Sequence, residues 1–229
     1  MRRGRLYSIF IVSVILLFPS LLYIIFATGN HHIDKMEVYG PIKDSTLYSI
    51  PHADFLSHLG DSISTDQFDD NIVVYNFFCV NCSDSSARNV LLVKAITERF
   101  FDKKDIKYVS INQTPSNWSP DGVTEYVKPF NVEEKQWFFV TADSNYLVDF
   151  AHNGLLVNSE YDEIKKPFGP GSATIVIVDK DQHIRGYFDG SQYIDQSSII
   201  DVIKRIRLEE YQNNAKRRED QFERKRDKK

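Results

Sequence analysis

The two cysteines of the chain, Cys79 and Cys82, are separated by two residues and are the side chains best suited to chemistry. A Cys-x-x-Cys pair that follows an apolar strand and precedes a helix is typical of a thioredoxin-type redox site. The same spacing occurs in half of a zinc site, but the sequence holds no further cysteine to complete one. The pattern therefore predicts catalytic thiols at Cys79 and Cys82. The alternative is a buried structural Cys79 beside an isolated Cys82 in a degenerate site.

The segments on either side of the pair explain how it is positioned. The apolar run from Ile72 to Phe78 predicts a strand that is buried on both faces and ends at Cys79. A serine or aspartate cap then opens a helix of about residues 84–102, whose unpaired N–H groups stabilise a thiolate. We therefore expect Cys82 to be the more reactive thiol and Cys79 the more buried one. A disulfide between them requires Cα atoms within about 7 Å of each other, which a tight turn permits and an extended strand does not.

Short strands and helices alternate along the rest of the chain. Ser119 and Asp143 are typical helix caps, and Pro120 suits the first position of a helix. The predicted elements are a hairpin within residues 49–68, strands at 72–79, 106–111, 137–141, 173–179 and 183–188, and helices at 84–102, 119–129 and 143–152. A last, long helix begins at residue 195; its apolar pattern stops near residue 211, and the charged tail beyond it is expected to be a solvated, partly helical extension. This order predicts an α/β fold, a thioredoxin-like sandwich with an N-terminal hairpin.

The N-terminal segment predicts one transmembrane helix ahead of this domain. The run from Leu6 to Ala27 contains no charged residue and, as a helix, reaches about 33 Å, enough to cross a bilayer core. Arg2, Arg3 and Arg5 precede it, which keeps the N-terminus cytoplasmic and places the domain on the extracytoplasmic, periplasmic side. The alternative is a cleaved signal peptide, with small residues at 27–29 as the cleavage site.

Composition divides the chain of 229 residues into four parts. They are a membrane anchor at residues 1–28, a linker at 29–48, the thioredoxin-like domain at 49–211 and a charged tail at 212–229. Residues 6–203 hold 14 basic and 26 acidic side chains, a formal charge of −12. Because nucleic-acid binders are basic, we expect no nucleic-acid partner. An exported domain faces an oxidising space, in which disulfide chemistry is meaningful.

Several segments resemble the Sco/SenC family, membrane-anchored thioredoxin-fold proteins implicated in assembling the copper site of cytochrome c oxidase. The resemblance covers about residues 49–207. It rests on an anchor followed by Ile50-Pro51 and a hairpin, NFF before the cysteine loop, Ser110-Ile111-Asn112 before a Thr-Pro helix lead-in, Trp137-Phe138-Phe139 with Thr141, and IVDKDQHIRGYFDG at residues 177–190. The last segment is the most specific match.

The resemblance implies a membrane-anchored, extracytoplasmic protein that acts in copper delivery or thiol redox maintenance during cytochrome c oxidase assembly. Its protein partner would carry thiols or a copper site, as in an oxidase subunit, and its metal would be copper. If the chain is an enzyme, it is a thiol–disulfide oxidoreductase. Two alternatives remain: an exported oxidoreductase of another branch that uses Cys79 and Cys82, and a non-catalytic scaffold that kept only the fold.

The copper-ligand pattern of the family is incomplete in this sequence. The family uses Cys-x-x-x-Cys and a distant histidine before a late strand. Alignment on the NFF segment puts the two cysteine positions on Cys82 and Ser86, and the alternative register puts them on Cys79 and Ser83. The histidine position falls near Gly171, where no histidine stands. Since copper(I) favours thiolates, the resemblance implies Cys79 and Cys82 as copper ligands without the family histidine.

Overall fold

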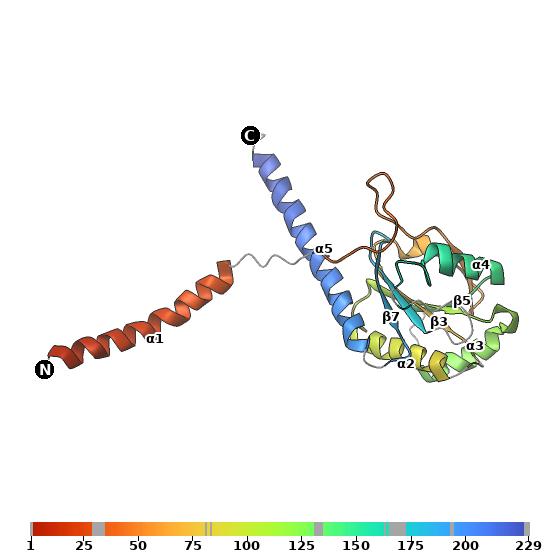
Figure 1. The fold of residues 1–229 in the computed structure, drawn as a ribbon, viewed down its shortest axis with the longest axis horizontal. Helices are drawn as coiled ribbons and strands as arrows, with labels where there is room; N and C mark the ends of the chain where they lie inside the picture. Colours follow the sequence, from red (N-terminus) through yellow and green to blue (C-terminus); the bar gives the residue numbers. More distant parts are fainter. Residues whose placement is uncertain are drawn as a thin grey trace. The chain divides into compact units, whose positions relative to one another are not determined.

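The computed structural model (Figure 1) describes residues 2–28, 35–80, 82, 84–130, 135–162, 164, 173–192 and 195–226. The chain forms two compact units, Met1–Lys35 and Met36–Lys229. The first unit contains the helix α1 (Arg2–Thr28). No helix in the described part of the chain is both long enough and apolar enough to cross a membrane. The four-part division expected from composition stays a prediction.

A seven-stranded mixed sheet forms the centre of the second unit, as far as its described residues show. In sheet order the strands are β2 (Ser62–Ser64), β1 (Asp54–Ser57), β5 (Trp137–Thr141), β4 (Ile106–Asn112), β3 (Ile72–Phe78), β6 (Thr174–Val178) and β7 (Ile184–Asp189). β3, β4 and β5 run parallel, whereas β1, β2, β6 and β7 run antiparallel to their neighbours. The carboxyl ends of the three parallel strands therefore meet at one edge of the sheet.

β3 lies between β4 and β6 and is buried along its whole length. Tyr75 packs into the core on one face of the sheet and Phe78 into the core on the other. A continuous apolar run is what burial on both faces requires, so this part of the prediction is confirmed. The strand ends at Phe78, one residue earlier than expected, because Cys79 already belongs to the turn that reaches Cys82.

Helices cover both faces of the sheet. They are α2 (Asp84–Arg99), α3 (Pro120–Val127), α4 (Ser144–Asp149) with a π-helix after it (Phe150–Gly154), and α5 (Asp195–Arg226). Figure 1 shows α4 on one side of the sheet and α2 and α3 on the other. Leu147 of α4 accordingly packs with Tyr75, whereas Val90 of α2 and Ile199 of α5 pack with Phe78. The predicted thioredoxin-like α/β sandwich with an N-terminal hairpin is confirmed.

Two predicted helix caps are confirmed, and the last helix extends beyond its apolar pattern. Oγ of Ser119 accepts a hydrogen bond from the N–H of Gly122 at 3.2 Å, and Oδ1 of Asp143 accepts one from Asn145 at 2.9 Å. α5 continues to Arg226, although its apolar pattern ends near residue 211. That pattern marks only the buried part of a helix, whereas the Glu, Lys, Arg and Gln residues beyond it are themselves good helix formers.

A buried ion cluster fastens α5 to the β6–β7 hairpin. Arg185 on β7 is 8% exposed and donates to Oδ2 of Asp179 at 2.7 Å and to Oε2 of Glu209 on α5 at 2.6 Å. It also donates to the carbonyl oxygen of Met36 at 3.2 Å. Burial opposes the charge of Arg185, but the hydrogen bonds to Asp179 and Glu209 outweigh burial and raise its pKa. One side chain thus holds three segments of the chain together.

We expect Arg185→Met to lower the free energy of unfolding by about 3–5 kcal/mol, because it leaves the buried Asp179 carboxylate and the partly buried Glu209 carboxylate without their counter-charge. The matched control is Lys204→Met, which breaks an exposed ion pair with Asp201 and should cost less than about 1 kcal/mol. Urea unfolding followed by circular dichroism measures both variants. Equal effects of the two substitutions would contradict a structural role for the buried cluster.

Candidate active site

A disulfide joins Cys79 and Cys82 directly after β3. Their Cα atoms lie 5.4 Å apart, so the loop turns tightly enough for the bond that the sequence left open. Cys79 is only 6% exposed, whereas Cys82 is half-buried. The expected difference in burial is confirmed. The catalytic role of both cysteines stays a prediction at this point.

The position of Cys82 favours its thiolate once the disulfide is opened. Cys82 lies two residues before Asp84, the first residue of α2. The first turn of a helix carries N–H groups without intrahelical partners and the positive end of the helix dipole, and both stabilise a nearby anion. Cys79 lies against the apolar core, where burial disfavours a charged sulfur. We therefore expect the two sulfur atoms to differ in reactivity once the disulfide is reduced.

Asn89 of α2 fastens the start of this helix to the end of β3. The side chain is fully buried, and its Nδ2 donates to the carbonyl oxygen of Phe77 at 3.1 Å. Gly190, directly after β7, lies against the same side chain. A Cβ atom at Gly190 would lie 2.6 Å from Oδ1 of Asn89 and 2.8 Å from the carbonyl oxygen of Ala173. Only a glycine lets α2 and the end of β7 approach this closely behind the disulfide.

The loop after β4 forms a polar wall of the site. The N–H of Gln113 donates to the carbonyl oxygen of Phe78 at 2.9 Å. This hydrogen bond holds the next residue, Thr114, close to the disulfide. Oγ1 of Thr114 lies 3.4 Å from Sγ of Cys79. Oδ1 of Asn112 lies 3.1 Å from the backbone N and 3.3 Å from Oγ1 of Thr114, and accepts hydrogen bonds from both. No role was predicted for Thr114 from the sequence. Its position directly after a strand that runs parallel to β3 is the sequence feature that could have indicated its proximity to the cysteines.

The inner wall of the site is apolar. Phe78, which directly precedes Cys79, is stacked on Tyr126 of α3 with ring centroids 6.0 Å apart. Burial raises the pKa of Tyr126, so its phenol is neutral at physiological pH. Val80 in the cysteine loop packs against the same core. The disulfide therefore has an apolar side toward the core and a half-exposed side at Cys82.

Only part of the copper-ligand set predicted from the resemblance falls within the described residues. Ser83 and Gly171 lie outside them, as does the side chain of Ser86. In the residues that the structure describes, no histidine, aspartate or glutamate joins the two cysteines to form a group of three ligand atoms. Cys79 and Cys82 thus supply two sulfur ligands once they are reduced, and the described residues place no histidine or carboxylate ligand beside them.

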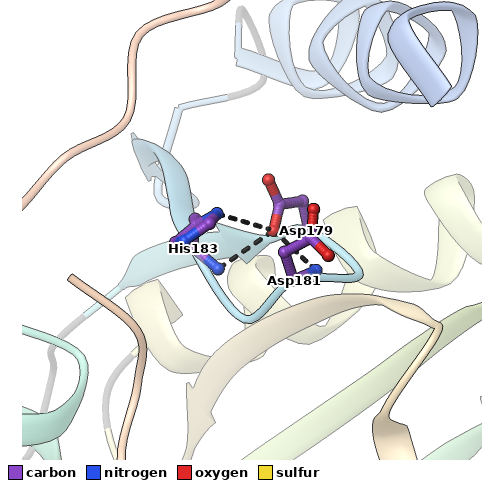
Figure 2. Close-up of side chains that lie close together, drawn as sticks. All are labelled: Asp179, Asp181 and His183. Carbon is purple, nitrogen blue, oxygen red and sulfur yellow. Dashed lines mark hydrogen bonds and ion pairs between the residues drawn. The ribbon is translucent and has the colours of Figure 1, made fainter. Parts of the chain in front are cut away.

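A second polar cluster, made of Asp179, Asp181 and His183, lies in the turn between β6 and β7 (Figure 2). Because β6 runs antiparallel to β3, this turn is at the opposite end of the sheet from the cysteines. Oδ1 of Asp179 accepts hydrogen bonds from the backbone N–H groups of Asp181 at 3.0 Å and His183 at 2.9 Å. Its Oδ2 accepts from Arg185. Hydrogen-bond donors, including the Arg185 cation, thus satisfy both oxygens of the Asp179 carboxylate. The cluster therefore stabilises the turn.

No protein-family model and no curated protein sequence matches this chain. Solved structures do match it in fold. A SCO1/SenC family lipoprotein from Bacillus anthracis has a TM-score of 0.61 and 15% identity, over 76% of this chain and 99% of that one. BsSco, a member of the Sco family of cytochrome c oxidase assembly proteins with an identified disulfide switch, has a TM-score of 0.60 and 14% identity, over 77% and 98%. The fold is Sco-like.

A third match extends the likeness to a structure with metal. Arabidopsis thaliana ScoI, solved with copper bound, has a TM-score of 0.55 and 16% identity, over 70% of this chain and 99% of that one. The Sco-like architecture therefore accounts for nearly the whole length of all three neighbours. The resemblance that the sequence segments suggested is confirmed in the fold, while the chemistry of this chain rests on its own residues.

After reduction, Cys82 is expected to react with iodoacetamide roughly tenfold faster than Cys79, because the helix start favours the Cys82 thiolate and burial disfavours that of Cys79. The rates are compared in the full chain carrying either Cys79→Ser or Cys82→Ser. In denaturant the two rates should converge, which controls for intrinsic reactivity. A faster reaction at Cys79 would show that Cys79, and not Cys82, is the more reactive thiol.

Proposed function

We propose that this chain is an extracytoplasmic Sco-like protein that exchanges disulfides through Cys79 and Cys82 during cytochrome c oxidase assembly. The observation that carries the proposal is the closed disulfide at the carboxyl end of β3, with Cys79 buried and Cys82 half-exposed. The likeness to BsSco, in which a disulfide switch was identified, supports it. In this role the chain acts as a thiol–disulfide oxidoreductase that keeps the cysteines of a partner protein reduced.

The exchange proceeds in two displacements at sulfur. In the first, the Cys82 thiolate attacks a disulfide of the partner, the partner S–S bond breaks, and one partner sulfur leaves and takes up a proton. In the second, Cys79 loses its proton and attacks Sγ of Cys82, which releases the other partner sulfur. Two electrons and two protons pass to the partner, and the chain ends with the Cys79–Cys82 disulfide seen in the structure.

The partner that this chemistry fits is a protein with a cysteine pair, as in an oxidase subunit whose thiols must be free to take copper. We further propose that the segment from Leu6 to Ala27, which has no charged residue and follows three arginines, attaches the chain to the membrane. The Bacillus anthracis neighbour is a lipoprotein, which supports a location at the outer face of a membrane. The acidic composition of residues 6–203 supports a partner other than nucleic acid.

Copper delivery is a second candidate function, with copper as the cargo. It is favoured by the copper-bound ScoI structure and by the two sulfur atoms of this site. Two thiolates suit copper(I), but no further ligand stands beside them in the described residues. We therefore expect the reduced chain to bind Cu(I) through Cys79 and Cys82 alone. Titration with Cu(I) beside Cys82→Ser tests this, and binding equal to that of the variant removes copper delivery.

The exchange is tested with the reduced full chain and a peptide whose two cysteines are closed in a disulfide. We expect the unaltered chain to open the peptide disulfide and to become oxidised at Cys79 and Cys82. The Cys79→Ser variant should stop at a mixed disulfide between Cys82 and the peptide, because the resolving thiol is missing. The Cys82→Ser variant should be inert. Peptide reduction by Cys82→Ser at the rate of the unaltered chain, or no exchange by any form, would remove the exchange function and leave copper delivery or a scaffold role.

A further inference from the structure

The hydroxyl of Thr114 lies beside the sulfur atom that changes charge when the disulfide opens. Its Oγ1 is 3.4 Å from Sγ of Cys79, within hydrogen-bonding distance for sulfur. Phe78 and Val80, on either side of Cys79 in the chain, pack into an apolar core. A sulfur anion in such a place is costly unless a donor faces it. Thr114 is half-buried in the loop after β4 and offers that donor.

We propose that the Thr114 hydroxyl donates a hydrogen bond to the Cys79 thiolate and so makes Cys79 the leaving sulfur when the disulfide is opened and the resolving sulfur when it closes. This inference rests on the proposed exchange at Cys79 and Cys82 and names a catalytic residue for it. An attacking thiolate forms a bond to Sγ of Cys82, and the bond between the two Sγ atoms breaks. The electron pair of the broken bond goes to Cys79, and the hydroxyl proton stays on Thr114.

Asn112 positions the Thr114 hydroxyl in both redox states. In the disulfide form, Oγ1 of Thr114 lies 3.3 Å from Oδ1 of Asn112, so the hydroxyl proton has an acceptor there. Oδ1 also accepts from the N–H of Thr114, which keeps the side chain in position when the hydroxyl rotates. A thiolate is a stronger acceptor than a neutral amide, because hydrogen bonds to charged groups are the stronger ones. The hydroxyl therefore turns to Cys79 as the charge develops, without movement of the backbone.

The test is the rate at which dithiothreitol reduces the disulfide in the full chain. Thr114→Val removes the hydroxyl at nearly constant volume and is expected to slow reduction about tenfold, because the leaving thiolate loses its donor. Thr114→Ser keeps the hydroxyl and should stay within about twofold of the unaltered chain. The control is Thr124→Val, in which the hydroxyl removed bonds the carbonyl oxygen of Pro120 on α3, and which should leave the rate unchanged.

An equilibrium measurement separates the electronic effect from damage to packing. In glutathione buffers at high pH, where the Cys79 thiolate is populated, Thr114→Val should favour the disulfide about tenfold, a potential lower by about 30 mV. If Thr114→Val unfolds the chain, the same comparison is made with Thr114→Ala, which also lacks the hydroxyl. Unchanged rate and equilibrium in the variant without the hydroxyl, or equal slowing in Thr114→Ser, overturns the inference. These assays need no protein partner, so they are independent of the peptide assay. The proposed exchange can fail in the peptide assay while the role of Thr114 is upheld here, and the role of Thr114 can fail while the exchange is upheld.

Discussion

The burial of β3 on both faces is the constraint on which the rest of the structure depends. All seven residues of this strand are buried, so its course is set by packing against helices on both sides of the sheet. The strand cannot shift by one residue without exchanging the side chains of the two cores. Cys79, which directly follows the strand, therefore has a fixed position at the carboxyl end of β3. The loop to Cys82, the start of α2 and the end of β4 are arranged around that point.

The same constraint makes the two sulfur atoms unequal. Cys79 directly follows the buried strand and is itself buried. Cys82 lies at the start of α2, which a hydrogen bond from Asn89 joins to β3. An exposed sulfur can be attacked by a partner, whereas a buried one is protected from it. A buried sulfur, however, needs a donor if it is to carry charge, and Thr114 is the donor that the fold supplies. Burial and the polar loop after β4 thus act together.

Features that depend on local sequence were predictable. The strand at Ile72–Phe78 follows from its apolar run, and the caps at Ser119 and Asp143 follow from the chemistry of helix starts. The role of Thr114 was not predictable in the same way, because its contact with Cys79 depends on how β3 and β4 pair, which is a long-range feature. The residue at which α5 ends could not be predicted, because charged residues continue a helix without leaving an apolar pattern.

The segment at residues 177–190 carries the most specific part of the family resemblance, yet its contacts are structural. Asp179 holds the β6–β7 turn through two backbone N–H groups, and Arg185 joins that turn to α5 through Glu209. These contacts specify the hairpin and the docking of a helix, at the end of the sheet away from the cysteines. The segment therefore indicates the Sco-like fold, while the proposed function rests on the less distinctive residues around β3.

The central claim is that Cys79 and Cys82 form a working redox couple, and the reduction potential of the full chain tests it most directly. The fraction of disulfide is followed by mass spectrometry in glutathione buffers, and in dithiothreitol buffers for lower potentials. A working couple titrates reversibly, as a two-electron couple, with a potential above about −300 mV, the level below which structural disulfides are typically found. A disulfide that stays closed below that potential, or that does not form again after reduction, would contradict the account.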